Sequence, residues 1–391
     1  MTRTMACSKF QPLLLLALLF CPLNLMAETT AKEQRHIYVK QSPCRPPLFV
    51  FGASLLDVGE NAAAMPGRSV SEFPPYGVHY FGRTAARFSN GRLLIDFITQ
   101  GLGYGFVDPF LKSLGSNFKH GVNFASSGAT ARNSTISGNG TSSLGLFSLN
   151  VQIDQFIEFK RSALGFKDPG YEEKILTEED VLEGVYLMEF GHNDYINYAF
   201  RDPNYSADIF AYETISYFKK ALLRLYNEGA RKVVVMNLMP LGCAPGVLGY
   251  IKPPKELQDE YGCLISYNNM VNLHNNHLSN LLKELRLELP RAEWVLFDWH
   301  SVIENAIRHP TRYGVRYPLK TCCGEVGEYN FEWTSQCGSL NATVCEDPTR
   351  HIFWDGLHFV DSFNNILGNK FLQGKNLIPK FLIKESCKIS K

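Results

Sequence analysis

The sequence lacks the motifs of several common enzyme classes. It contains no Gly-x-Ser-x-Gly elbow, no glycine-rich loop ending in Gly-Lys-Ser/Thr and no His-Glu-x-x-His, so neither an α/β-hydrolase elbow, a P-loop nor a zincin metal site is indicated. It also lacks an excess of one charge, because 39 Lys plus Arg stand against 38 Asp plus Glu. A formal charge of +1 supplies little field for neutralising the phosphates of a nucleic acid. We therefore expect no nucleic-acid partner, no cofactor and no metal.

Long hydrophobic runs are missing as well. The apolar run near the N-terminus spans Leu13–Phe20, which is too short to cross a bilayer. Arg3 and Lys9 lie before it and the small residue Ala27 comes after it, an order typical of a cleaved secretory signal peptide. We therefore predict a secreted protein, extracellular or apoplastic with the vacuole as the alternative, without stable membrane insertion. The predicted parts are a signal peptide over residues 1–27, an N-terminal extension over 28–46 and a single domain over 47–391.

The predicted mature chain retains eight of the ten cysteines. An even number of cysteines in an oxidising compartment favours disulfides, although the sequence leaves their pairing open. The alternative is a zinc site in the cluster between Cys322 and Cys345, but two adjacent cysteines do not match the usual spacing of zinc ligands. We therefore predict disulfides among Cys44, Cys243, Cys263, Cys322, Cys323, Cys337, Cys345 and Cys387.

Four Asn-x-Ser/Thr sequons are candidates for glycosylation, and each would lie in a surface loop if it were modified. Asn133 and Asn139 fall in residues 126–148, a segment rich in Ser, Thr, Asn and Gly that we expect to be a long solvated loop. A substrate lid is the alternative for this segment. The other two sequons are at Asn204 and Asn341.

Short apolar runs alternate with segments of helical period, which is typical of parallel strands joined by helices. Hydrophobic residues make up 45% of the chain, enough to bury a large core. Apolar residues three or four positions apart predict helices over residues 93–98, 215–225 and 278–289, and a further helix is expected over 361–371. The predicted strands are Leu48–Phe51, Gly121–Ala125, Val185–Phe190, Lys232–Met236 and Trp294–Phe297.

Residues suited to catalysis follow three of these strands. In an open parallel sheet, ligands bind beyond the carboxyl ends of the strands, so these positions are the ones that matter. Ser54 follows the first strand, Gly128 the second and Asn193 the third. Near the C-terminus, Asp355 stands three residues before His358. We expect all five residues to meet at one edge of the sheet.

Acyl transfer through a serine requires these residue types. A hydroxyl is a poor nucleophile at neutral pH unless a base removes its proton, and His358 is the candidate base for Ser54. A carboxylate that fixes the imidazole tautomer and stabilises the imidazolium is the role expected for Asp355. The backbone N–H groups of Ser54 and Gly128 and the side-chain amide of Asn193 are candidate donors to an oxyanion.

Alternatives exist for some of these roles. His300 follows a strand beside Asp298 and is the alternative base to His358, although we assign His300 a buried or capping role. His192 is interpreted as a loop histidine, with an effect on substrate at the oxyanion side as the alternative. Asp57 is interpreted as a turn-forming residue.

Four blocks of sequence carry these residues in order. Gly52–Leu55 resembles the GDSL block, and Gly121–Gly128, Gly191–Asp194 and Trp354–His358 resemble the blocks that follow it in plant GDSL esterases/lipases of the SGNH hydrolase superfamily. The resemblance covers about residues 47–370, and four ordered blocks are far more specific than any one of them. Within the family, the chain is similar to early-nodulin-like and acetylesterase-like plant enzymes.

The resemblance implies a fold and a site. The fold would be a flavodoxin-like, three-layer α/β/α sandwich with a mainly parallel five-stranded sheet, in a single SGNH hydrolase domain. The site would combine a catalytic triad of Ser54, Asp355 and His358 with an oxyanion hole from Ser54, Gly128 and Asn193.

The chain departs from the family pattern at two positions. Ala53 stands where the family has an aspartate before the serine, so a carboxylate that would brace the nucleophile turn is missing. Phe359 stands where proline is common after the histidine.

We therefore predict a secreted carboxylic-ester hydrolase, an esterase, lipase or acetylesterase, that acts on a small-molecule or polysaccharide ester. The absent carboxylate at position 53 motivates one alternative, a non-catalytic secreted binding protein on the same scaffold. An acyltransferase that uses the same serine is the other alternative. The sequence leaves the acyl group and the oligomeric state open.

Overall fold

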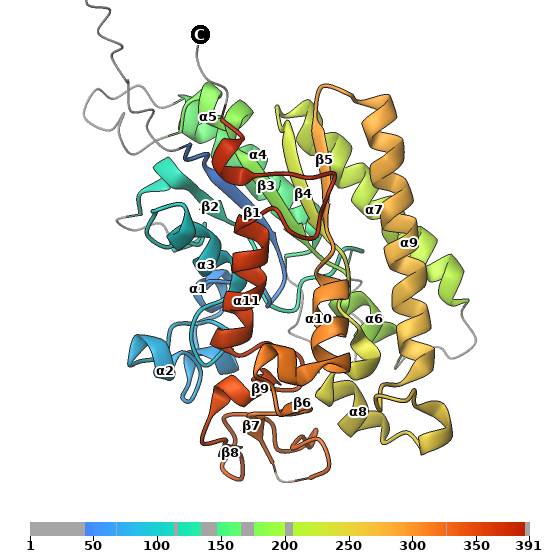
Figure 1. Ribbon diagram of the computed structural model, residues 1–391. Helices are drawn as coiled ribbons and strands as arrows, with labels where there is room; N and C mark the ends of the chain where they lie inside the picture. The colour runs from blue at the N-terminus through green and yellow to red at the C-terminus, as the bar shows by residue number, and fades with distance from the viewer. Residues whose placement is uncertain are drawn as a thin grey trace, which may run out of the picture. The chain divides into compact units, whose positions relative to one another are not determined.

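A six-stranded sheet lies at the centre of the computed structural model (Figure 1). The strand order is β10-β5-β4-β3-β1-β2; β1 to β5 run parallel and β10 pairs antiparallel with β5. The strands are β1 (Leu48–Gly52), β2 (Gly121–Asn123), β3 (Val185–Glu189), β4 (Lys232–Met236), β5 (Glu293–Phe297) and β10 (Leu377–Ile378). The structure describes residues 44–67, 69–112, 116–133, 147–165, 176–199, 206–325 and 327–387.

All five predicted strands are present, but the prediction of a five-stranded sheet was wrong by one strand. The additional strand, β10, is two residues long and pairs with Phe297 and Leu296 of β5. A run of two residues shows no periodicity, so the sequence pattern held no signal for it. Because β10 lies at the edge, the class of fold is unaffected.

Helices cover both faces of the sheet (Figure 1). One layer contains α3 (Leu94–Gly101), α10 (Trp299–Arg308) and α11 (Asp361–Leu372). The other contains α4 (Leu149–Gly165), α7 (Ala207–Asn227) and the C-terminal half of α9 (Ile265–Glu288). The three-layer α/β/α sandwich is therefore confirmed. Four of these helices match the segments predicted to be helical, although Leu93 and Leu289 lie one residue outside α3 and α9.

The side chains of β1 show how the two cores arise from one strand. Successive residues of a strand point to opposite faces. Leu48 and Val50 enter the core beneath α3 and α11, whereas Phe49 and Phe51 enter the core beneath α4 and α7. The ring of Phe49 lies 5.3 Å from that of Phe156 on α4, centroid to centroid. A fully buried strand of this kind suits a parallel sheet covered on both sides.

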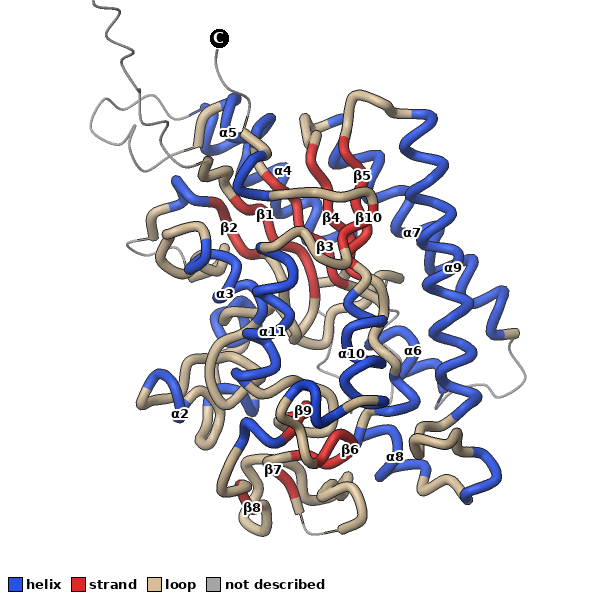
Figure 2. The backbone as a smooth tube through the Cα atoms, in the orientation of Figure 1, coloured by secondary structure: helices blue, strands red, loops and turns tan. Residues whose placement is uncertain are grey.

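Short strands outside the central sheet carry the C-terminal part of the chain. Two pairs form, β6 with β9 in parallel and β7 with β8 antiparallel, and Figure 2 shows them apart from the central sheet. The remaining elements are α1 (Glu60–Ala64), α2 (Val78–Phe81), α5 (Glu178–Glu183), α6 (His192–Ala199), α8 (Pro245–Ile251), β6 (Tyr317–Thr321), β7 (Cys323–Gly324), β8 (Thr343–Val344) and β9 (His351–Phe353).

Disulfides join all eight cysteines of the predicted mature chain, which confirms the disulfide interpretation. Cys322, Cys345 and His351 do lie together, but the sulfur atoms of the two cysteines are bonded to each other. The pairs are Cys44–Cys387, Cys243–Cys263, Cys322–Cys345 and Cys323–Cys337.

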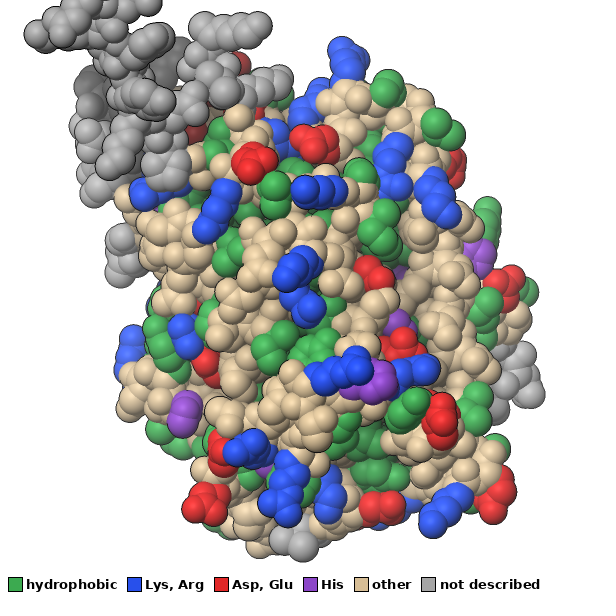
Figure 3. Space-filling view, viewed as in Figure 1, with side chains coloured by type: hydrophobic (Ala, Val, Ile, Leu, Met, Phe, Trp, Pro, Cys, Tyr) green, Lys and Arg blue, Asp and Glu red, His purple; other side chains and the backbone are tan. Residues whose placement is uncertain are grey.

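Several predictions concern the surface and the ends of the chain. The predicted signal peptide, most of the extension and the sequons Asn139 and Asn204 lie outside the described residues, while Asn133 and Asn341 are exposed. The expected loop over residues 126–148 begins with buried rather than solvated residues, Ser126 to Ala131, and residues 134–146 are outside the description. Within the described ranges, no helix has both the length and the apolar character needed to cross a membrane. Basic and acidic side chains both occur over the face shown in Figure 3.

The Cys44–Cys387 disulfide should make a large contribution to stability. It links the two ends of the described chain across 343 residues, so breaking it releases far more conformational freedom in the unfolded state than breaking Cys243–Cys263, which spans 20. We expect the Cys44→Ser/Cys387→Ser variant to lose about 2–5 kcal/mol in a denaturant titration, and Cys243→Ser/Cys263→Ser to lose less. An unfolding midpoint equal to that of the unaltered protein would contradict this prediction.

Candidate active site

Ser54 lies in a tight turn that directly follows β1. The carbonyl oxygen of Ala53 accepts hydrogen bonds from the N–H groups of Leu56 (3.1 Å) and Asp57 (3.0 Å), so the chain makes one helical turn here. The first N–H groups of such a turn have no internal acceptor. Accordingly, the N–H of Ser54 donates to none of the described residues. Its side chain is half-buried, which leaves the hydroxyl accessible.

The structure brings Ser54, His358 and Asp355 together, although the serine and the histidine are 304 residues apart in the chain. The Ser54 Oγ atom lies 2.7 Å from His358 Nε2. On the other side of the ring, His358 Nδ1 lies 2.7 Å and 2.8 Å from the two carboxylate oxygens of Asp355. Both Asp355 and His358 are buried. This places a hydroxyl, an imidazole and a carboxylate in one hydrogen-bonded row.

A tight loop after β9 orients the imidazole. The Trp354 N–H donates to the His358 carbonyl oxygen (2.6 Å), and Asp355 Oδ1 accepts from the N–H groups of Leu357 and His358 (2.9 Å each). Burial acts to raise the pKa of the Asp355 carboxyl, but the charge and hydrogen bond of His358, with these backbone donors, bring the pKa below its ordinary value. The carboxylate is therefore ionised at neutral pH.

Tyr76 is a site residue that the sequence analysis missed. Its hydroxyl donates to Asp355 Oδ2 (2.8 Å), and its ring packs edge-on against Phe88 and Trp354. Burial and the charge of Asp355 raise the pKa of Tyr76 well above its ordinary value, so the hydroxyl stays a donor. Phe88 in turn lies 4.6 Å from the His358 ring, centroid to centroid. The contact of Tyr76 depends on chain folding over 279 residues, and no local pattern indicates it.

The other two predicted site residues, Gly128 and Asn193, lie in the segments that follow β2 and β3. Gly128 has a φ of 79°, a conformation that favours glycine, and its N–H donates to none of the described residues. Asn193, in the first turn of α6, donates one N–H of its amide to the Ala129 carbonyl oxygen (2.8 Å). The Ser126 N–H donates to the Gly52 carbonyl oxygen (3.0 Å), which ties this loop to the nucleophile turn.

Buried carboxylates fix these loops in place. Asp57 accepts from the N–H groups of Gly59 (2.7 Å) and Ser127 (2.7 Å), and burial raises its pKa to about 6 despite these donors. Asp194 accepts from the N–H groups of Ala131 (2.8 Å) and Arg132 (3.0 Å), and burial likewise raises its pKa to about 6. Asp57 therefore forms the turn that the sequence indicated, and it also joins the first loop to the second.

The two other histidines considered from the sequence lie in different surroundings. The Nδ1 atom of His300 is 2.8 Å from the Leu238 carbonyl oxygen, and its backbone N–H is held by Asn237 (3.1 Å). His192 is buried at the start of α6 instead of exposed in a loop, and its Nδ1 atom lies 2.6 Å from Glu189 Oε1. The imidazole that contacts Ser54 is that of His358.

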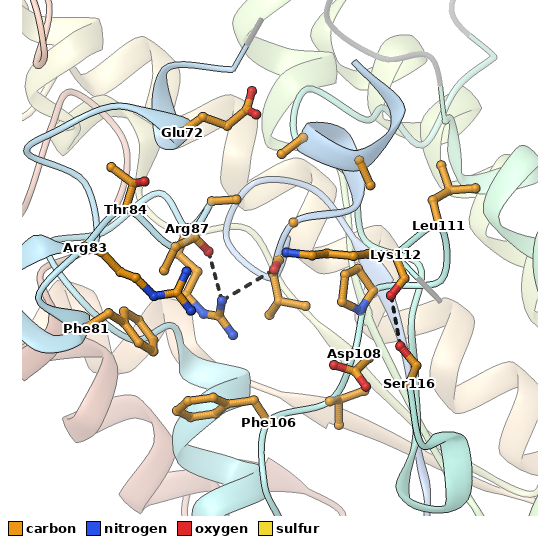
Figure 4. Close-up of a pocket in the computed structure, with 18 residues that line it drawn as sticks. Glu72, Phe81, Arg83, Thr84, Arg87, Phe106, Asp108, Leu111, Lys112 and Ser116 are labelled. Carbon is orange, nitrogen blue, oxygen red and sulfur yellow. Dashed lines mark hydrogen bonds between the residues drawn. The ribbon is translucent and has the colours of Figure 1, made fainter. Parts of the chain in front are cut away.

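A cavity of about 860 Å³ lies near α1 and α2 (Figure 4). Its lining includes Phe81, Arg83, Arg87, Phe106 and Lys112, but none of the five predicted site residues. The Arg87 guanidinium is already paired with a buried carboxylate. The candidate active site is therefore the contact between the Ser54 hydroxyl and the His358 imidazole, and not this cavity.

Several known proteins are similar to this chain. A family model described as "GDSL-like Lipase/Acylhydrolase" matches residues 48–371. A GDSL esterase/lipase of Arabidopsis thaliana is 33% identical over 87% of this chain and 91% of its own length. The GDSL esterase/lipase ENOD8 of Medicago truncatula is 33% identical over 88% and 90%, and an esterase of Hevea brasiliensis is 31% identical over 96% and 95%. A solved structure of a proposed GDSL-like lipase from Parabacteroides merdae matches with a TM-score of 0.34 and 10% identity, over 85% of this chain and 95% of that chain.

The Tyr76–Asp355 hydrogen bond predicts an effect on ester turnover. In Tyr76→Phe, the Asp355 carboxylate loses one donor, which raises the pKa of this carboxyl and leaves the carboxylate less firmly oriented towards His358. We expect kcat/KM to fall about ten-fold.

The matched control is Tyr80→Phe, which removes the hydroxyl of an exposed tyrosine on α2. We expect it to leave kcat/KM unchanged. An unchanged kcat/KM in Tyr76→Phe would show that Tyr76 only fills space.

Proposed function

The chain belongs to the GDSL-like lipase/acylhydrolase family, and from this premise we propose that it cleaves carboxylic esters through a covalent acyl intermediate on Ser54. The single observation that carries this mechanism is the 2.7 Å contact between the Ser54 hydroxyl and His358 Nε2. A buried carboxylate on the far side of the ring supports it. Membership of the family makes the chain an ester hydrolase; the roles of its residues are our proposal.

In the first half of the reaction, His358 Nε2 takes the proton of the Ser54 hydroxyl as its oxygen attacks the ester carbonyl carbon. The imidazolium that forms is stabilised by Asp355, whose two oxygens face Nδ1. The alcohol leaves with the proton that His358 carries, and the acyl group stays on Ser54. In the second half, His358 takes a proton from a water molecule as the water oxygen attacks the acyl carbon. The bond between the acyl group and Ser54 then breaks, Ser54 regains its proton from His358, and the acid is released.

The negative charge that develops on the carbonyl oxygen needs donors that are already in place. The free N–H groups of Ser54 and Gly128 and the amide of Asn193 are the proposed oxyanion hole. Asn193 uses one amide hydrogen to hold Ala129, which leaves the second for substrate. Because these donors are fixed by the loops, they require little reorganisation during the reaction.

The geometry favours hydrolysis over the alternative of a non-catalytic binding protein. A binding scaffold has no need for a serine, an imidazole and an ionised carboxylate in one hydrogen-bonded row. We propose a small-molecule or polysaccharide ester as substrate. The four disulfides support a secreted location, because such bonds persist in oxidising compartments.

Removal of the nucleophile tests the proposal directly. We expect Ser54→Ala to lose turnover of a short p-nitrophenyl ester while it stays folded, because no other group can form the acyl intermediate. A fluorophosphonate probe should label Ser54 in the unaltered protein and should fail to label it in His358→Ala. The control is Ser216→Ala, a half-buried serine on α7. Full turnover by Ser54→Ala would remove Ser54 from the mechanism.

The oxyanion hole can be tested separately. In Asn193→Ala, the side-chain donor is lost, and we expect kcat to fall about 100- to 1,000-fold with little change in KM, because the donor acts in the transition state. Asn305→Ala, at a half-buried asparagine on α10, should keep the normal kcat. A change confined to KM would assign Asn193 to ground-state binding of substrate instead.

A further inference from the structure

Glu189 is a fully buried carboxylate that the proposed reaction does not use. It ends β3, and its side chain lies between the nucleophile turn and α6. Its Oε2 atom accepts a hydrogen bond from the Ala53 N–H (3.2 Å), and its Oε1 atom lies 2.6 Å from His192 Nδ1. No Lys or Arg forms an ion pair with it in the described part of the chain. A buried carboxylate is costly unless its oxygens are paired, so this arrangement calls for an explanation.

The tautomer of His192 is set by a second contact. Its Nε2 atom accepts a hydrogen bond from the backbone N–H of Met239 (3.0 Å), so that nitrogen carries no proton. The proton is therefore on Nδ1 and is donated to Glu189. Since His192 is buried, with its ring edge-on to Trp299, it has little freedom to turn away.

The two partners of Glu189 stand directly before two residues of the proposed mechanism. Ala53 precedes the nucleophile Ser54, and His192 precedes the oxyanion donor Asn193. One carboxylate thus connects the peptide before the nucleophile with the residue before the oxyanion amide. We infer that Glu189 is a positioning residue that, through Ala53 and His192, sets Ser54 and Asn193 relative to each other. This inference rests on the proposed function and deepens it.

A carboxylate contacts this turn even though residue 53 is an alanine and not the aspartate of the family pattern. It comes from β3, where Glu189 accepts from the Ala53 N–H. Gln152 supports the same turn from α4, since it accepts from the Gly52 N–H (2.9 Å) and donates to the Gly52 carbonyl oxygen (2.8 Å). A Cβ on Gly52 would lie 2.9 Å from the Glu189 carbonyl oxygen, so a glycine is needed for this close approach.

A glutamine at position 189 cannot replace the carboxylate. The Ala53 N–H and the His192 Nδ1–H are both donors, and a carboxylate offers an acceptor to each, whereas an amide offers one acceptor and one donor. If His192 changed tautomer to accept from the amide, its Nε2–H would face the Met239 N–H. In every arrangement one buried donor faces another, and the loops must shift to separate them.

The test compares Glu189→Gln with Glu60→Gln, the same change at another fully buried glutamate. Burial raises the pKa of Glu60 to about 8, so this group is protonated at neutral pH and a glutamine mimics it. We expect Glu189→Gln to lower kcat for the p-nitrophenyl ester about 10- to 100-fold with KM nearly unchanged, and Glu60→Gln to keep the normal kcat. If Glu189→Gln does not fold, Glu189→Asp takes its place, with a smaller fall in kcat because two acceptor oxygens remain.

A double-mutant cycle separates positioning from a general structural role. If Glu189 acts through the placement of Asn193, Glu189→Gln lowers kcat by a much smaller factor in the Asn193→Ala variant than in the unaltered protein. An unchanged kcat in Glu189→Gln, or losses that are fully additive with Asn193→Ala, would overturn this inference alone. Absence of Ser54-dependent turnover in the unaltered protein would instead overturn the proposed function.

Discussion

Buried carboxylates that accept backbone N–H groups hold the site together. Asp57 joins the loop after β1 to Ser127 in the loop after β2, and Asp194 joins the loop after β3 to Ala131. Glu189 joins the end of β3 to the turn before the serine. A buried N–H group without an acceptor destabilises the fold by about 1–3 kcal/mol. Breaking any one of these hydrogen bonds would therefore carry that cost. These three segments therefore cannot move independently, and the relative positions of the Ser54 hydroxyl and the proposed oxyanion donors follow from this constraint.

The proposed base, His358, is held by a different part of the chain. Asp355 and His358 follow a short strand outside the central sheet, where two disulfides and the β6–β9 and β7–β8 pairs hold the chain. Adjacent cysteines contact this segment directly, because the Cys322 N–H donates to the Phe353 carbonyl oxygen (3.0 Å) and the Cys323 N–H to that of Trp354 (2.7 Å). Cys322 and Cys323, whose adjacency argued against a zinc site, therefore help to hold the loop that contains His358. Tyr76 holds the same loop through its hydrogen bond to Asp355.

The parts of the fold that could be predicted from sequence are those with a strong local signal. The parallel strands are uniformly apolar because both of their faces are buried, and helices such as α7 and α9 repeat apolar residues along one side. The two-residue β10 has no period, and α4 begins directly after a segment whose composition indicates a loop. Tyr76 could not be found in this way, because its importance comes from a partner far away in the chain. Glu189 was hidden within a predicted buried strand, where a lone acidic residue is easily taken for the end of the strand.

The turn around Ala53 shows how a departure from a sequence motif can be judged in a structure. A motif records which residue stands at a place in the chain, whereas the position of the turn after β1 depends on every group that contacts it. In this protein β3 runs beside β1 in register, with Glu189 paired to Gly52, so the side chain of Glu189 reaches the N–H of Ala53. Gln152 holds the adjacent residue, Gly52, from α4. The turn therefore has two buried side-chain partners although residue 53 is an alanine, and the 2.7 Å contact between Ser54 and His358 forms with this alanine in place.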